Sequence, residues 1–206
     1  KRVALVERDR CAQIDSGHTS AHLTMVTDKR LTELVKAFGR DHAQAAWDAG
    51  LAAIDQIDTI ARTERIDCSF EWVDGYLHAP IEGESQGPSL QDDASLANDL
   101  GFDATFIDAV PFVGRPGIRF DNQARFHPRR YLAGLAKAFE AAGGQIFEHS
   151  DAEEFCAEPL AVKVNSHTLT CDDIVIATHN PLVGVRNIAG ATIFQTKLAL
   201  YTSYVV

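Results

Sequence analysis

A short apolar run that ends in an acid constrains the fold of this chain more than any other feature of its sequence. Residues Val3 to Val6 suit a strand buried on both faces of a parallel sheet, and Glu7 follows them directly. In a dinucleotide-binding fold, the second strand ends in such an acid, whose oxygens accept hydrogen bonds from the ribose hydroxyls of the adenosine. Many strands that end in Glu simply reach the surface there, so this position alone leaves both interpretations open.

The glycine loop that accompanies such a strand, G-x-G-x-x-G, does not occur in the 206 residues. It is expected about 20 residues before the acid, which places it before Lys1. The chain also begins without Met and opens directly into a strand. We therefore expect it to be an internal piece of a longer protein.

Composition favours small-molecule chemistry. An apolar share of 46% and a charged share of 23% are typical of a globular protein, and the net charge of -10 argues against nucleic acid or an anionic membrane as partner. No apolar run reaches about 18 residues, so no membrane span is expected. The four cysteines are far apart and form no C-x-x-C pair, which predicts reduced thiols in a cytoplasmic protein and no metal site.

Apolar residues at helical spacing predict three main helices. The first runs from a capping Asp28 to a terminating Gly39, and the second begins at about Asp41 and carries Trp47 on its apolar stripe. A third starts at His127-Pro128 and ends at Gly143-Gly144, with Pro in its first turn. A shorter helix is expected after the loop 80–91, through Leu100.

Strand-like segments predict a separate, mostly β layer between these helices. Residues 70–78 suggest a hairpin, because Asp74-Gly75 is a strong turn signal between two strand-like runs. Further strands are expected at 104–110 and 117–126. A β-meander is expected from 154 to 170, then a second buried strand at 172–178 and a final strand at 198–206.

Two more stretches could serve a cofactor. The loop from Ser16 to Thr24 offers hydroxyls, backbone N–H groups and a glycine that could line a pyrophosphate or a flavin ring, although loops of this composition are commonly solvated. The predicted strand that ends at Ala177-Thr178 has small residues at its tip, where backbone can approach a cofactor. An ordinary turn at Asn180-Pro181 explains the same residues.

Taken together, the stretches resemble the D-amino-acid oxidase and glycine oxidase superfamily of flavoproteins, the DAO family. The resemblance rests on VALVE at 3–7, SGHTSAHLT at 16–24, VDGYL at 73–77, FHPRRYLAGLA at 126–136, DDIVIATHNP at 172–181 and KLALYTSYVV at 197–206. It is strongest toward a bacterial subgroup whose members carry a C-terminal Rieske iron–sulfur domain. The motifs cover nearly the whole chain, in order.

The resemblance implies an α/β (mixed α+β) fold, with an incomplete Rossmann-like FAD-binding domain and a β-rich substrate domain. The FAD-binding domain would comprise residues 1–69 and 127–190, and the substrate domain residues 70–126 and 191–206. It implies these cofactor-binding residues: Glu7, Arg8, Ser16, Gly17, Thr19, Ser20, Ala21, His22, Ala152, Ala177 and Thr178. It assigns no catalytic residue and no metal ligand.

The implied function is an FAD-dependent oxidoreductase that oxidises an amine or amino-acid-like substrate by hydride transfer to the flavin. We expect the full-length protein to be yellow and this piece alone to bind FAD poorly. Two alternatives stay open: a folded but inactive fragment that pairs with a copy of itself or with missing parts of the protein, and an NAD-dependent dehydrogenase, because Glu7 would serve an NAD ribose equally well.

Other charged residues are ambiguous. Arg115, Arg119 and Arg125 could bind a substrate carboxylate, or be solvated surface arginines. Asp92-Asp93 is expected to belong to a solvated face.

Overall fold

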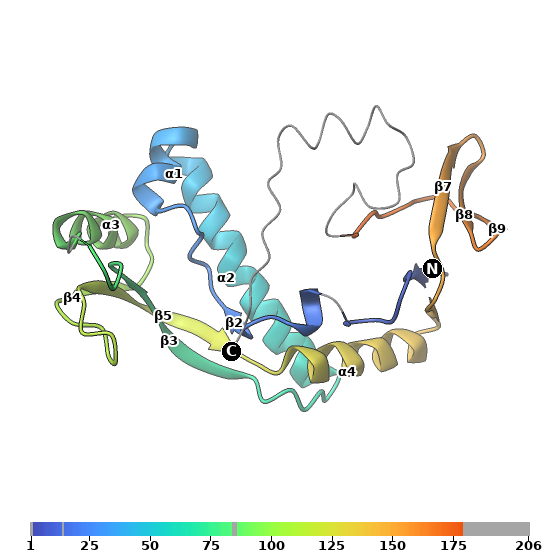
Figure 1. Cartoon of the computed structure of the whole chain (residues 1–206), viewed down its shortest axis with the longest axis horizontal. Coiled ribbons are helices and arrows are strands. Elements are labelled where there is room, and N and C mark those ends of the chain that lie inside the picture. Colours follow the sequence, from blue (N-terminus) through green and yellow to red (C-terminus); the bar gives the residue numbers. More distant parts are fainter. Residues whose placement is uncertain (1, 14, 84–85, 179–206) are drawn as a thin grey trace. The chain divides into compact units, whose positions relative to one another are not determined.

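The computed structural model describes residues 2–13, 15–83 and 86–178, which fall into two compact units (Figure 1). The central unit comprises residues 20–134, and the discontinuous unit comprises residues 1–19 and 135–206. Helices and several sheets occur together, which confirms the predicted mixed α/β class. The functional division into an FAD-binding and a substrate domain stays a prediction.

The central unit is built on an antiparallel sheet with one long strand in its middle. β5 (Gly117–Arg125) pairs with β3 (Glu71–His78) along one edge. Its other edge pairs with β4 (Ala104–Ile107) and with the short β2 (His22–Leu23). The predicted strands at 104–110 and 117–126 are therefore confirmed, with the first ending three residues early.

Three helices cover one face of this sheet: α1 (Leu31–Phe38), α2 (Arg40–Thr63) and α3 (Gly87–Asp99) (Figure 1). Trp47 of α2 is the centre of the core, with its ring edge-on to Phe102 at 5.3 Å and to Phe120 of β5 at 5.5 Å between centroids. Leu90 of α3 and Ile118 of β5 are buried in the same cluster. Fully burying each large apolar side chain contributes about 1.5–3 kcal/mol, so this cluster holds helices and sheet together.

Only the C-terminal end of α1 agrees with the prediction from the sequence. Gly39 ends the helix in a positive-φ conformation (φ 86°), as its sequence position suggested. The predicted cap at Asp28 is wrong, because the helix begins after Arg30 and its N-terminal Thr32 N–H donates to Asp93 of α3, at 3.1 Å from Oδ1. A buried carboxylate from another helix takes the role that a local side chain would otherwise have.

The predicted hairpin at 70–78 is also wrong, because β3 runs straight through Asp74-Gly75. The pairing with β5 shifts register between Val73 and Gly75, so the Asp-Gly pair forms an irregularity in one strand instead of a turn between two. A Cβ on Gly75 would lie only 2.6 Å from Cγ of Gln123. Glycine is therefore needed there for close approach of a neighbouring side chain, and the turn preference of Asp-Gly is overridden.

The discontinuous unit contains two small sheets. β1 (Ala4–Val6) pairs in parallel with β6 (Gln145–Phe147), which follows α4 (Pro128–Ala141). β7 (Ala152–Ala157), β8 (Leu160–Val164) and β9 (His167–Thr170) form the predicted meander. The predicted third helix is confirmed as α4.

Burial of β1 on both faces, however, is not observed. Val3 and Leu5 are 50% and 41% exposed, and β6 is the only described strand that pairs with β1. A parallel strand is buried on both faces only where other elements cover those faces.

The predicted strand at 172–178 does not form. Residues 173–178 have no regular structure, and Val175 is 88% exposed. An apolar run becomes a strand only when a neighbouring strand supplies its hydrogen bonds, and no described strand pairs with this one. The predicted strand at 198–206 lies outside the described residues, as do Asn180 and Pro181.

Candidate functional site

Glu7 lies directly after β1, where the sequence placed the ribose-binding acid. Its backbone N–H donates to the carbonyl of Phe147 and its own carbonyl accepts from Ser150 N–H, both at 2.9 Å. Its Oε1 accepts the N–H of Asp9 at 2.8 Å. Within the described chain its Oε2 has no hydrogen-bond partner, so the partly buried carboxylate keeps acceptor capacity for two hydroxyls.

The turn after Glu7 is fastened to the segment after β6. His149 N–H donates to the Asp9 carbonyl, and Cys11 N–H donates to Oε1 of Glu148, both at 2.8 Å. Burial raises the pKa of the Cys11 thiol, and the nearby carboxylates of Glu148 and Glu7 raise it further. The turn is thus held in place by hydrogen bonds to the segment after β6.

Only some of the other predicted cofactor-binding residues of the discontinuous unit lie near Glu7. Ala152 begins β7 two residues after Ser150, which bonds to Glu7, so these two predicted residues share one edge of the unit. Arg8 is exposed. Ser16 and Gly17 lie in a 3-10 turn (Asp15–Gly17), whereas Ala177 and Thr178 are exposed and have no regular structure. Within the described chain, no hydrogen bond or ion pair joins any of these last four residues to Glu7. Thr19 is exposed as well.

Ser20, Ala21 and His22 belong to the central unit. Ser20 is exposed, and Ala21 has a positive φ of 67°, an unfavourable conformation for a residue with a side chain. The Ala21 carbonyl accepts from Phe126 N–H at 3.3 Å, and His22 then pairs with Arg125 across β2 and β5. The turn at Ala21 therefore directs His22 onto the sheet.

His22 lines a cavity of about 330 Å³ in the central unit that is open to solvent. The other lining residues come from the segment after β2 and from the two central strands: Thr24, Val26, Thr27, Asp28, Gly75, Tyr76, Leu77 and Phe120. The strand residues are largely apolar, while the segment after β2 adds hydroxyls and the carboxylate of Asp28. No Arg or Lys is among these lining residues, so the cavity suits a ligand with an apolar body and a cationic or hydrogen-bonding group.

Two buried polar residues that bind to the chain after β2 were not predicted from the sequence. Gln123 is fully buried in β5, and Asp93 in α3 is 3% exposed although Asp92-Asp93 was expected to be solvated. That expectation is wrong for Asp93, because Arg30 and the N-terminus of α1 cover and neutralise it. Gly75 is the one sequence signal near Gln123, since a glycine within a strand can mark close approach.

The three arginines considered for substrate carboxylate binding all have other partners. Arg125 is bound to Glu71 through Nη2 at 2.6 Å, Arg119 lies 3.0 Å from Asp121, and Nη2 of Arg115 donates to the Gly83 carbonyl. None of them lines the cavity. The interpretation as surface arginines therefore fits Arg125 and Arg119 better.

The histidines and cysteines of the described residues do not gather into a group of three that could hold a metal ion. His18 and His22 are four residues apart, but the chain between them is not helical and does not place them on one helical face. No group of three potential metal-binding side chains occurs among the described residues, and all four cysteines are free thiols. Within the same residues no helix combines the length and apolar character required to cross a bilayer.

Comparison with known proteins identifies the family. A sequence model of the DAO family, described as FAD dependent oxidoreductase, matches residues 1–196. The Rieske 2Fe-2S iron-sulfur protein YhfW of Bacillus subtilis is 28% identical over 202 residues, which cover 95% of this chain and 39% of YhfW. The oxidoreductase OrdL of Haemophilus influenzae is also 28% identical, over 87% of this chain and 43% of OrdL. The chain thus spans less than half the length of these relatives.

Solved structures show the same fold. Glycine oxidase from Geobacillus kaustophilus superposes with a TM-score of 0.67 at 13% identity, over 85% of this chain and 48% of that one. L-alpha-glycerophosphate oxidase from Mycoplasma pneumoniae, solved with FAD bound, gives a TM-score of 0.57 at 14% identity, over 82% of this chain and 44% of that one. With the family match over residues 1–196, the conclusion is that this chain belongs to the DAO family of FAD-dependent oxidoreductases.

Proposed function

We propose that the protein carrying this chain oxidises an amine or amino-acid-like substrate by transferring a hydride from the substrate's C–N carbon to FAD. Family membership supports FAD as the cofactor and oxidation as the reaction class. The observation that carries the proposal to particular residues is the acid Glu7 at the end of a parallel strand, held beside the segment that leads into Ala152.

The residues present fit the adenosine half of FAD. Glu7 has a carboxylate oxygen with no partner among the described residues, and a carboxylate accepts two ribose hydroxyls well. We assign it to the ribose and the backbone of Ala152 to the adenine. The loop residues from Ser16 to His22 are assigned to the pyrophosphate and flavin, and Ala177 and Thr178 to the adenosine diphosphate.

When bound, FAD supplies the hydride acceptor, while the protein supplies positioning and electrostatics. We assign the substrate to the cavity of the central unit. Asp28 would attract the positive charge of an amine, and the apolar surface of Leu77 and Phe120 would receive its carbon skeleton. Removing that charge in Asp28→Asn is expected to raise KM for a cationic amine about tenfold, since a hydrogen bond to a charged group contributes about 1.5–3 kcal/mol.

The proposal is tested on the full-length protein. We expect flavin absorbance in the purified protein and its bleaching when an amine substrate is added without oxygen. A colourless protein that binds and reduces NAD instead would support the dehydrogenase alternative. A protein with neither activity would support the inactive module.

The relative named as a Rieske protein supports a second, narrower proposal. We propose that the full-length protein carries a Rieske domain outside these residues, because YhfW matches 95% of this chain. Two iron atoms per protein molecule and the electron paramagnetic resonance signal of a reduced Rieske cluster are the expected results. Absence of iron from the full-length protein would contradict it.

A further inference from the structure

The two buried polar side chains of the central unit hold the same stretch of chain. Among the described residues, the buried polar or charged side chains are Gln123 in β5 and Asp93 in α3. Both bind to residues 24–32, which we call the anchored segment. Buried polar groups must be fully hydrogen-bonded, so each of these contacts constrains the segment strongly.

Gln123 fixes the start of the anchored segment. Its Oε1 accepts the backbone N–H of Met25 at 2.9 Å and the hydroxyl of Thr24 at 2.8 Å. Its Nε2 donates to the carbonyl of Asp121 at 2.9 Å, so the amide itself is oriented by β5. Because Gly75 has no side chain, the side chain of Gln123 can pack directly against its backbone.

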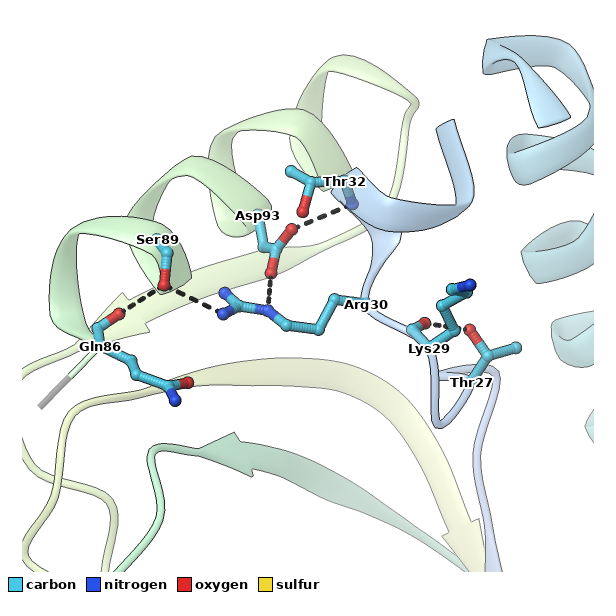
Figure 2. A network of polar contacts seen from close by, with 7 residues as sticks. All are labelled: Thr27, Lys29, Arg30, Thr32, Gln86, Ser89 and Asp93. Carbon is cyan, nitrogen blue, oxygen red and sulfur yellow. Dashed lines mark hydrogen bonds and ion pairs between the residues drawn. The ribbon is translucent and has the colours of Figure 1, made fainter. Parts of the chain in front are cut away.

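Asp93 fixes the end of the anchored segment, as Figure 2 shows. Its Oδ2 pairs with Nε of Arg30, and its Oδ1 accepts the N–H of Thr32 at 3.1 Å. Nη1 of Arg30 also donates to Ser89 of the same helix at 3.0 Å. Arg30 thus reaches along α3 and ties the first turn of α1 to it.

The chain between these two anchors forms one wall of the cavity. Thr24, Val26, Thr27 and Asp28 line it, and the hydroxyl of Thr27 donates to the Lys29 carbonyl at 2.8 Å. The same hydroxyl accepts from Nε1 of Trp47 at 3.3 Å. The wall is therefore fixed at both ends and once in the middle.

We propose that Gln123 and Asp93 are positioning residues for substrate binding, which act by holding the anchored segment so that Asp28 and its neighbours face the substrate. This inference rests on the proposed function, which assigns the cavity to the amine substrate. Neither residue touches the substrate. Loosening either anchor lowers the fraction of molecules in which the wall is correctly formed, and the apparent affinity for substrate falls by that fraction.

The test uses two anchor variants and a control in the full-length protein. Gln123→Met keeps the approximate length of the side chain but removes both acceptor and donor. Asp93→Asn keeps an acceptor for Thr32 and removes the charge that pairs with Arg30. Ser95→Ala is the control, because Ser95 is an exposed residue of α3 whose hydroxyl bonds, among the described residues, to the Gln91 carbonyl of its own helix.

We expect Gln123→Met to raise KM for the amine about tenfold while kcat changes by about twofold or less, and Asp93→Asn to raise KM by a smaller factor. Hydrogen exchange at the amides of Met25 and Thr32 is expected to accelerate in the corresponding variant and to stay unchanged in Ser95→Ala. If Gln123→Met does not fold, Asp93→Asn tests the same claim through the other anchor.

The two readouts separate this inference from the function on which it rests. Faster exchange with an unchanged KM would overturn the positioning role while leaving the oxidoreductase function intact. Unchanged exchange in both anchor variants would overturn the anchors themselves. If the wild-type protein oxidises no amine, the proposed function fails, and the positioning role fails with it even where the exchange data support the anchors.

Discussion

Gly75→Ala is the substitution whose effect can be worked out most completely. The new Cβ would lie 2.6 Å from Cγ of Gln123, well inside ordinary contact distance. Gln123 can move away only by lengthening its bonds to Thr24, Met25 and Asp121, which are 2.8–2.9 Å long. Overpacking of this kind costs about 1–3 kcal/mol.

One term opposes this cost. Alanine restricts the unfolded chain more than glycine does, which stabilises by about 0.4–1 kcal/mol where the native backbone accepts it. Gly75 is not among the residues with positive φ, so its backbone accepts alanine. The net expectation is a loss of about 1–2 kcal/mol in the free energy of unfolding.

Urea unfolding followed by tryptophan fluorescence measures this loss, because Trp47 and Trp72 both lie in the central unit. The decisive comparison repeats Gly75→Ala in a Gln123→Ala background. Without Cγ the nearest remaining side-chain atom of residue 123 is Cβ, 3.3 Å from the new Cβ, so alanine at position 75 is expected to cost much less there. An equal loss in both backgrounds, or no loss in the wild type, would refute the reasoning.

Three further predictions follow from the described contacts. Phe102→Ala is expected to lower the free energy of unfolding, measured by urea unfolding, by about 3–5 kcal/mol, because it leaves a cavity beside Trp47. A loss below about 1 kcal/mol would contradict this core packing. Burial raises the pKa of the Cys68 thiol above 9.0, so the unfolded chain loses this proton first as pH rises. The contribution of this thiol to stability is present below about pH 9 and is lost above it, so Cys68→Ala should lose stability less steeply than the wild type in urea titrations from pH 8 to 11, whereas equal slopes would count against it. Glu148→Gln is expected to lower the pKa of Cys11 and so to speed its alkylation by iodoacetamide at pH 8, resolved by mass spectrometry; an unchanged rate would show that Glu148 does not act on the thiol.

Helices were the part of the fold that the sequence predicted well. Their apolar spacing is a local property, and Gly39 and Gly143 adopt the positive φ that ends a helix. Strand formation, in contrast, depended on pairing partners that lie far away in the sequence. Asp74-Gly75 became part of a continuous strand because β5 pairs on both sides of it, and residues 172–178 formed no strand because no described strand pairs with them.

The residues of the candidate site also differ in whether local sequence could predict them. The position of Glu7 at the end of a parallel strand was predictable from the apolar run directly before it, whereas its role at the ribose stays a prediction. Gln123 and Asp93 were not, because their partners Met25 and Thr32 are 98 and 61 residues away in the chain. A polar residue is buried only where such distant partners satisfy it, and no local pattern reports them.

The central claim is that Glu7 holds the adenosine ribose of FAD, and titration of the flavin-free full-length protein with FAD tests it most directly. Replacing Glu7 with Ala is expected to weaken FAD binding about 10- to 100-fold, because hydrogen bonds to a charged group contribute about 1.5–3 kcal/mol. FMN, which lacks the adenosine, should bind both proteins equally, and Glu140→Ala, an exposed acid of α4, should leave FAD binding unchanged. Equal FAD affinity in the wild type and Glu7→Ala would contradict the account.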